Sequence, residues 1–388
     1  MIAYMIFFCY NFTRERVKLM ENKPMSKKKT IISVIIVLIL TIATFSIFLN
    51  FQDINAVIES IKTVNGVEMT IAFVCLLLYA LTWPLSLCIM AYKQRHRAHF
   101  LDNYLVGESE HFFNGITPFA TGGQPIQIYL LTKSGIKPSE STGLIFTNFI
   151  ALLIATNIFA IVSLFFYGSL SENFTSTTSW MIALGFVMNI FTLVFMILMM
   201  TSKFIRNFFR KCLEALCKIK FIGKRLTKLI PVFDNYCSNA QEASKEIFSH
   251  FWTFILAIIL RMISLVFYYA IPFFILRSLG IPLDYNLLPL IILASSFAIT
   301  TMVWVPTPGG TGGIEFAFTT IFTASIFGTI SPSVGAAGMI LWRGLTYYLL
   351  LIISMLAYIG YIIRTNIKHK KGEIINDTCP TDGEQASL

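Results

Sequence analysis

Three charged residues fall within or beside long apolar stretches, where a charge is costly. Arg261 lies ten residues into the apolar run 251–276, Arg343 lies seven residues into the run 336–363, and Glu315 follows a glycine-rich break. A basic group at the centre of a bilayer costs at least about 2.5–3.5 kcal/mol unless it is paired or hydrated. We therefore expect these residues to face a polar interior and to form at least one ion pair. That pair would line a polar pathway or headgroup site, or would only fix helix packing.

Two proline- and glycine-rich segments share the pattern P-x-x-T-G-G. They are Pro118–Gly123 and Pro308–Gly313, 190 residues apart. Such runs cannot continue a helix, and at membrane depth an irregular backbone is tolerated only beside protein or water. The helix ends at such breaks supply partial charges that can bind an anionic group. The candidate binding residues are Pro118, Gly122, Gly123, Gln124, Gln127, Arg261, Pro308, Gly309, Gly310, Gly312, Glu315 and Arg343.

The composition indicates a membrane protein. Of 388 residues, 56% are hydrophobic and 13% are charged, about half the roughly 25% of soluble proteins. So few charges cannot cover a soluble core of this size. Two apolar regions, 101–133 and 286–328, contain the breaks and predict re-entrant hairpins. Six further runs are long enough to cross a bilayer, at about 31–51, 69–92, 142–167, 178–200, 251–276 and 336–363.

The charges predict the orientation. The chain has 30 Lys and Arg against 20 Asp and Glu, a net charge of +10. Basic residues cluster at 27–29, 93–97, 201–250 and 364–371. The positive-inside rule therefore predicts that both termini are cytoplasmic and that the hairpins enter from opposite faces. With the shared motif, this favours an all-α polytopic membrane protein built as an inverted repeat, although a short glycine-rich match also arises by chance.

The chain divides into three parts by composition. Residues 1–30 form an N-terminal extension, and the expected true start is Met25, just before a basic cluster, or Met20. The alternative is that the extension forms a short interfacial helix. Residues 31–363 form the membrane domain, and residues 364–388 form a polar, disordered tail. Within the membrane domain, 201–250 reads as basic amphipathic helices on the cytoplasmic surface, which accounts for the charge without a nucleic-acid partner.

Recognisable cofactor and catalytic motifs are absent from the sequence. The seven cysteines are scattered without a C-x-x-C pair, so neither a zinc site nor a disulfide framework is expected. There is no P-loop and no Rossmann fingerprint, and no cofactor or metal is predicted. Glu108, Glu110 and His111 precede the first break; they either line the cytoplasmic mouth of a cavity or form the wet face of an interfacial helix.

The two breaks and the last span resemble the lysylphosphatidylglycerol synthase transmembrane-region family. The resemblance covers residues from about 30 to 365 and rests on three motifs: Phe113-Asn114-x-x-x-Pro118-x-x-x-Gly122-Gly123-x-Pro125, Pro306-x-Pro308-Gly309-Gly310-x-Gly312-x-x-Glu315 and Arg343-x-x-Thr346-Tyr347-Tyr348. The family usually has an acidic residue and an arginine flanking the proline of the first loop. Here Gln124 and Gln127 stand in those positions, so the first half-site has lost charge.

The resemblance implies a flippase-like protein of the bacterial cytoplasmic membrane. Its substrate would be a phospholipid or a lipid-linked headgroup, with lysyl-phosphatidylglycerol as one candidate. Multiple peptide resistance factors join such a region to a soluble lysyltransferase. This chain looks like the membrane half alone, so we expect a transporter and not an enzyme. The alternatives are a membrane component of lipid aminoacylation and antimicrobial-peptide resistance, acting with a separate synthase, and a non-catalytic envelope-biosynthesis scaffold. Self-association is a further expectation.

Overall fold

The computed structural model describes residues 54–93, 100–117, 120–166, 176–217, 230–302, 307, 310, 312–322 and 330–370. The elements of these residues are all helical, with no strand among them. Five helices are long and apolar enough to cross a membrane: Gly66–Tyr92, Pro138–Leu164, Ile182–Thr201, Phe251–Ser278 and Ser333–Ile367. They confirm five of the six predicted spans. The predicted span 31–51 and the extension 1–30 lie outside the described residues.

The first part of the bundle contains one long interrupted span, a broken hairpin and a second span. The helices are α4 (Ile54–Lys62), α5 (Gly66–Thr82), α6 (Leu85–Lys93), α7 (Phe100–Glu108), α8 (Glu110–Gly115), α9 (Gly123–Lys133) and α10 (Pro138–Leu164). The predicted break in 101–133 is confirmed, because α8 ends before the glycine motif and α9 begins at its last residue.

The second part repeats this order of elements. Its members are α16 (Phe251–Ser278), the short helix η2 (Tyr285–Leu287), α17 (Leu288–Met302), α18 (Gly313–Phe322), α19 (Pro332–Arg343), η4 (Gly344–Leu349) and α20 (Leu350–Lys370). Helices α9 and α18 begin at Gly123 and Gly313, the last residues of the two P-x-x-T-G-G motifs. The two motifs therefore occupy equivalent structural positions.

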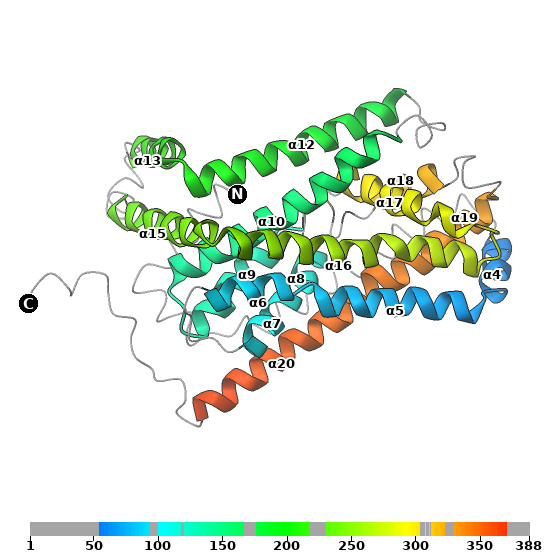
Figure 1. Ribbon diagram of the computed structural model, residues 1–388, viewed down its shortest axis with the longest axis horizontal. Helices are drawn as coiled ribbons and strands as arrows, with labels where there is room; N and C mark the ends of the chain where they lie inside the picture. The colour runs from blue at the N-terminus through cyan, green and yellow to red at the C-terminus, as the bar shows by residue number, and fades with distance from the viewer. Residues whose placement is uncertain are drawn as a thin grey trace, which may run out of the picture.

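The two parts run in opposite directions. Figure 1 shows α5 running away from the end of the bundle that holds α4, whereas α16 runs toward it. In the same view α9 lies toward the end that holds α13 and α15, and α18 lies toward the α4 end. The broken hairpins thus belong to opposite ends of the bundle, as an inverted repeat requires.

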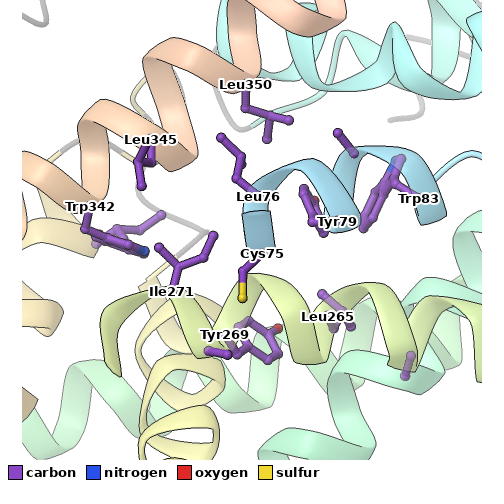
Figure 2. Packing of buried hydrophobic residues seen from close by; sticks show 14 of the residues in the cluster. Cys75, Leu76, Tyr79, Trp83, Leu265, Tyr269, Ile271, Trp342, Leu345 and Leu350 are labelled. Carbon is purple, nitrogen blue, oxygen red and sulfur yellow. The ribbon is translucent and has the colours of Figure 1, made fainter. Parts of the chain in front are cut away.

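The core lies where α5, α16 and the last span meet. Its buried side chains include residues of all three elements, shown in Figure 2: Cys75, Leu76, Tyr79, Trp83, Leu265, Tyr269, Ile271, Trp342, Leu345 and Leu350. Between α5 and α6 the helix is interrupted at Trp83 and Pro84. The apolar run 69–92 predicted a continuous helix here. A proline lacks the N–H that continues a helix, so the interruption has a local cause.

The last span contains a π-helical turn directly after Arg343. This turn, η4, spans Gly344–Leu349 and is flanked by the α-helices α19 and α20. Single π-turns of this kind are rare and are frequently found at functional sites. Helix α20 continues to Lys370, so residues 364–370 of the predicted disordered tail are helical. The rest of the tail lies outside the described residues.

The basic segment between the two parts contains helices. Helix α12 (Ser176–Thr201) is followed by α13 (Lys203–Cys217) and α15 (Ile230–Ser249). On α13, Phe204 and Phe208 are exposed between basic residues. This arrangement fits a helix lying on a membrane surface.

Two buried charge clusters at the broken helices

A buried ion pair lies at the second break, between Glu315 and Arg343. The Arg343 Nε atom lies 2.6 Å from Glu315 Oε1. The two residues are 4% and 5% exposed. The pair confirms that the three predicted charges include an ion pair.

The backbone of the break holds this glutamate in place. The Gly312 N–H donates to Glu315 Oε2 at 2.6 Å, so the carboxylate bonds the loop on one side and the arginine on the other. Gly312 has a φ of 94° and Gly310 a φ of 65°, in the left-handed region that glycine adopts most readily. Glu315 lies in the first turn of α18, where the positive end of the helix dipole favours a negative charge.

The other cluster lies at the first break and surrounds Arg261. The Arg261 guanidinium stacks over the Trp83 ring, 3.9 Å from its centroid. Its Nη2 atom lies 3.9 Å from Glu110 Oε2, and the Trp83 indole N–H donates to the same oxygen at 3.2 Å. Arg261 and Glu110 are 2% and 3% exposed. Arg261 thus joins the second half of the repeat to the hairpin of the first half.

Two glutamines complete the Glu110 site. The Gln124 side-chain amide donates to Glu110 Oε1 at 3.3 Å, and that of Gln127 donates to Glu110 Oε2 at 3.4 Å. These are the positions at which the family resemblance led us to expect an acidic residue and an arginine. The two glutamines lie on α9 and instead donate to the carboxylate of Glu110, which lies on α8, the helix before the break. The first half-site therefore keeps a buried charge pair, supplied by Glu110 and Arg261.

The interruption at Trp83 and Pro84 positions this cluster. Gly107 packs against Pro84 so closely that a Cβ on Gly107 would lie 2.8 Å from the Pro84 Cβ. This close approach sets α7 and α8 beside the end of α5, where Trp83 meets Glu110. The Gly123 N–H donates to Asn114 Oδ1 at 2.8 Å and the Gly122 N–H to Thr117 Oγ1 at 2.9 Å, which ties the break to α8.

Two tyrosines connect the clusters. The Tyr79 and Tyr268 rings lie 4.7 Å apart between centroids. Tyr79 also contacts His111 and Trp83, at 5.2 Å between ring centroids in each case, on the side of the first break. Tyr268 lies near Arg343 and Thr346, on the side of the second break. The buried charges of both breaks and the two tyrosines between them therefore form one polar line through the core.

The interpretation of Glu108, Glu110 and His111 as the wet face of an interfacial helix is wrong. Glu108 and Glu110 are each only 3% exposed. The pattern of α7 and α8 gave no sign of burial, because the residues that cover them come from distant parts of the chain. Tyr79, Trp83 and Tyr268 were not predicted as site residues, because in the sequence they look like ordinary apolar core residues.

Of the predicted binding residues, those that the structure describes fall into the two clusters. Gly122, Gly123, Gln124, Gln127 and Arg261 belong to the first break, and Gly310, Gly312, Glu315 and Arg343 belong to the second. Pro118, Pro308 and Gly309 lie outside the described residues. Outside these clusters, Asn148 accepts from Ser86 at 2.8 Å and so links α10 to α6.

The fold and the two clusters define an all-α, multi-pass membrane protein with opposed broken helices around a polar core. The sequence profile of the lysylphosphatidylglycerol synthase transmembrane region matches residues 30–354. The chain therefore belongs to that family.

Two relatives have similar lengths. A UPF0104 membrane protein of Archaeoglobus fulgidus is 24% identical over 321 residues, covering 79% of this chain and 90% of its own. An uncharacterised MG306 homologue of Mycoplasma pneumoniae is 23% identical over 359 residues, covering 87% of this chain and 89% of its own.

Proposed function

We propose that this protein moves a phospholipid or a lipid-linked headgroup between the leaflets of a bacterial cytoplasmic membrane. The observation that carries the proposal is the polar line from Glu315 and Arg343, past Tyr268 and Tyr79, to Arg261 and Glu110. Its two ends lie at the two broken hairpins, which belong to opposite halves of the inverted repeat. Such a layout is the one that transporters use to build a central site.

The chemistry of the line suits a charged headgroup. Guanidinium groups bind phosphate through planar, paired donors, and the Nε and Nη1 atoms of Arg261 have no hydrogen-bond partner among the described residues. The acyl chains of the substrate would stay in the bilayer, beside the exposed apolar side chains of α5 such as Leu77 and Leu81. The headgroup alone would follow the polar line.

The orientation follows from the distribution of charge. Helix α13, with Lys203, Arg206, Arg210 and Lys211, lies at one end of the bundle, and α4 lies at the other (Figure 1). Under the positive-inside rule the α13 end is cytoplasmic. The first break would then be reached from the cytoplasm and the second from outside.

The test is leaflet-resolved translocation of tail-labelled lipids in proteoliposomes. Phosphatidylglycerol, lysyl-phosphatidylglycerol and phosphatidylethanolamine, each with a label on one acyl chain, would be compared for the wild type and for Glu315→Gln. The matched control is Glu214→Gln, because Glu214 pairs with Arg210 at 2.9 Å on an exposed surface. We expect translocation of at least one lipid by the wild type and by Glu214→Gln, and a loss of at least about tenfold in Glu315→Gln, equal to about 1.4 kcal/mol.

Each alternative has its own outcome in the same system. Equal rates in all three proteins, or rates no higher than those of protein-free vesicles, would count against translocation through this line. Formation of lysyl-lipid by cells that express this chain alone would instead favour a role in lipid aminoacylation. An envelope phenotype that survives substitution of both Glu315 and Arg343 would favour a scaffold.

A further inference from the structure

The buried carboxylates of the described residues outnumber their arginine partners by one. Five acidic residues are buried: Glu68, Asp102, Glu108, Glu110 and Glu315. Four of them pair with an arginine, at 2.8 Å for Arg277 and Glu68, 2.6 Å for Arg364 and Asp102, 3.9 Å for Arg261 and Glu110, and 2.6 Å for Arg343 and Glu315. Glu108 has no ion-pair partner of its own within the described residues.

The surroundings of Glu108 give it no hydrogen bond either. Within the described part of the chain, both of its carboxylate oxygens are buried without a partner. The charged and titratable groups that interact with it are Tyr79 from α5, Tyr104 from its own helix, Glu110 from α8 and Arg261 from α16. One guanidinium therefore faces two carboxylates.

Arg261 and His111 are also incompletely satisfied. The Nε and Nη1 atoms of Arg261 and the Nε2 atom of His111 are buried without a hydrogen-bond partner among the described residues. A native interior rarely leaves so many polar atoms unpaired in one place, and a functional role or a bound water or ion is among the explanations for such a group. An ionised carboxylate without donors is especially costly in this setting.

We propose that Glu108 binds one proton and that its protonation is coupled to substrate movement past Arg261. A proton removes the single unbalanced charge of the cluster and needs only one free oxygen. A sodium ion would need several oxygen ligands at once, and the oxygens of the neighbouring Glu110 already accept from Trp83, Gln124 and Gln127.

The coupling follows from the shared arginine. When Glu108 is protonated, Arg261 balances Glu110 alone and the cluster is neutral. When an anionic headgroup binds the unpaired donors of Arg261, the local charge becomes more negative, so uptake of the proton by Glu108 is favoured. The ligand and the proton thus bind with positive linkage, and each raises the affinity for the other. This coupling rests on the proposed function, but the proton site itself does not.

The first test reads the proton directly and needs no transport. Infrared spectra of the purified full-length protein would be recorded across a pH series for the wild type, Glu108→Gln and Glu214→Gln. We expect a carbonyl-stretch band of a protonated, buried carboxyl group in the wild type that disappears in alkaline buffer. The band should be absent from Glu108→Gln and retained in Glu214→Gln. An identical band in all three proteins, or no such band at any pH, would overturn the assignment.

Glu108→Asp keeps the proposal testable if Glu108→Gln does not fold. The aspartate retains a titratable group, so it should keep a carboxyl band with an altered pH midpoint. A spectrum of Glu108→Asp that matches the wild type in both band position and midpoint would assign the band to another residue and overturn the proposal.

The second test measures coupling in proteoliposomes with an imposed pH gradient. One proton per cycle shifts the steady-state lipid distribution by up to about tenfold for each pH unit, since that gradient corresponds to about 1.4 kcal/mol. We expect this shift in the wild type and none in Glu108→Gln. Translocation that ignores the pH gradient, or follows a sodium gradient instead, would overturn the coupling and leave the proposed function intact. If the infrared band is present but no lipid is translocated, the proton site stands and the proposed function is overturned.

Discussion

Tyr79 and Tyr268 stand between the two buried ion pairs, with their ring centroids 4.7 Å apart. They come from α5 and α16, the long helices that begin the two halves of the repeat. A contact between equivalent helices places the tyrosines at the midpoint of the polar line. Both clusters therefore lie on either side of one aromatic contact.

The Glu315 and Arg343 pair should show strong energetic coupling. Replacing Glu315 by glutamine leaves Arg343 buried and charged without its partner, which typically costs about 3–5 kcal/mol, whereas removing both charges is often close to neutral. We expect Glu315→Gln to lower the thermal unfolding midpoint in detergent. The double variant with Arg343→Met should recover part of that loss. A double variant that is less stable by the sum of the two single effects would show that the residues act independently.

Gly123 should not tolerate a side chain. A Cβ at this position would lie 2.6 Å from Asn114 Oδ1 and 2.7 Å from Glu110 Cγ. We expect Gly123→Ala to destabilise the protein by about 1–3 kcal/mol, typical of overpacking, and to slow translocation. Gly66→Ala is the matched control, because no atom lies within 4 Å of a Cβ there. Comparable unfolding midpoints for the two variants would contradict the close packing at the first break.

Arg261 should not be replaceable by lysine. A lysine keeps the positive charge but loses the planar group that stacks on Trp83 at 3.9 Å. Desolvated contacts of this type contribute about 2 kcal/mol, so we expect Arg261→Lys to slow lipid translocation at least about tenfold. Arg210→Lys, at an exposed ion pair, is the control and should retain the wild-type rate. If Arg261→Lys is as active as that control, charge alone is sufficient at this position.

Cysteine labelling should establish the orientation. Cys212 is exposed on α13, which we place in the cytoplasm. In a background where the other cysteines are serine, a membrane-impermeant maleimide should label Cys212 in inverted vesicles and not in intact cells. Glu59→Cys on α4, at the other end of the bundle, should show the reverse pattern in the same background after Cys212→Ser. Labelling of both sites from the same side would rule out the proposed topology.

The sequence was sufficient for the elements that depend on local composition. Hydropathy located the described spans, and proline with glycine located both breaks, because each is a property of neighbouring residues. The Glu315 and Arg343 pair could be anticipated, since both charges are costly in an apolar stretch. The partner of Arg261 could not be identified, because Glu110 lies in a short polar segment whose pattern is also typical of a solvent-exposed helix. Only packing against α5 and α16 buries it.

The role of the glutamines also lay beyond sequence reasoning. Gln124 and Gln127 looked like a lost charge when they were compared with the family pattern. In the structure they donate to Glu110, so the charge of the first half-site stands elsewhere in the chain. The interruption at Trp83 and Pro84 was missed because a single proline does not lower the hydropathy of a long apolar run.

The π-helical turn gives the last span a particular mechanical role. Arg343, just before the turn, reaches Glu315 of the second hairpin at 2.6 Å, and Tyr347, within the turn, donates to the Gly115 carbonyl of the first hairpin at 3.0 Å. The last span therefore contacts both hairpins, through two residues that lie less than two helical turns apart. A π-turn holds one residue more than an α-turn. Conversion of the π-turn to regular α-helix would therefore rotate Arg343 relative to Tyr347 by about 100°, the angle of one residue in an α-helix. The six residues of η4 are thus where a relative movement of the hairpins would have to be absorbed.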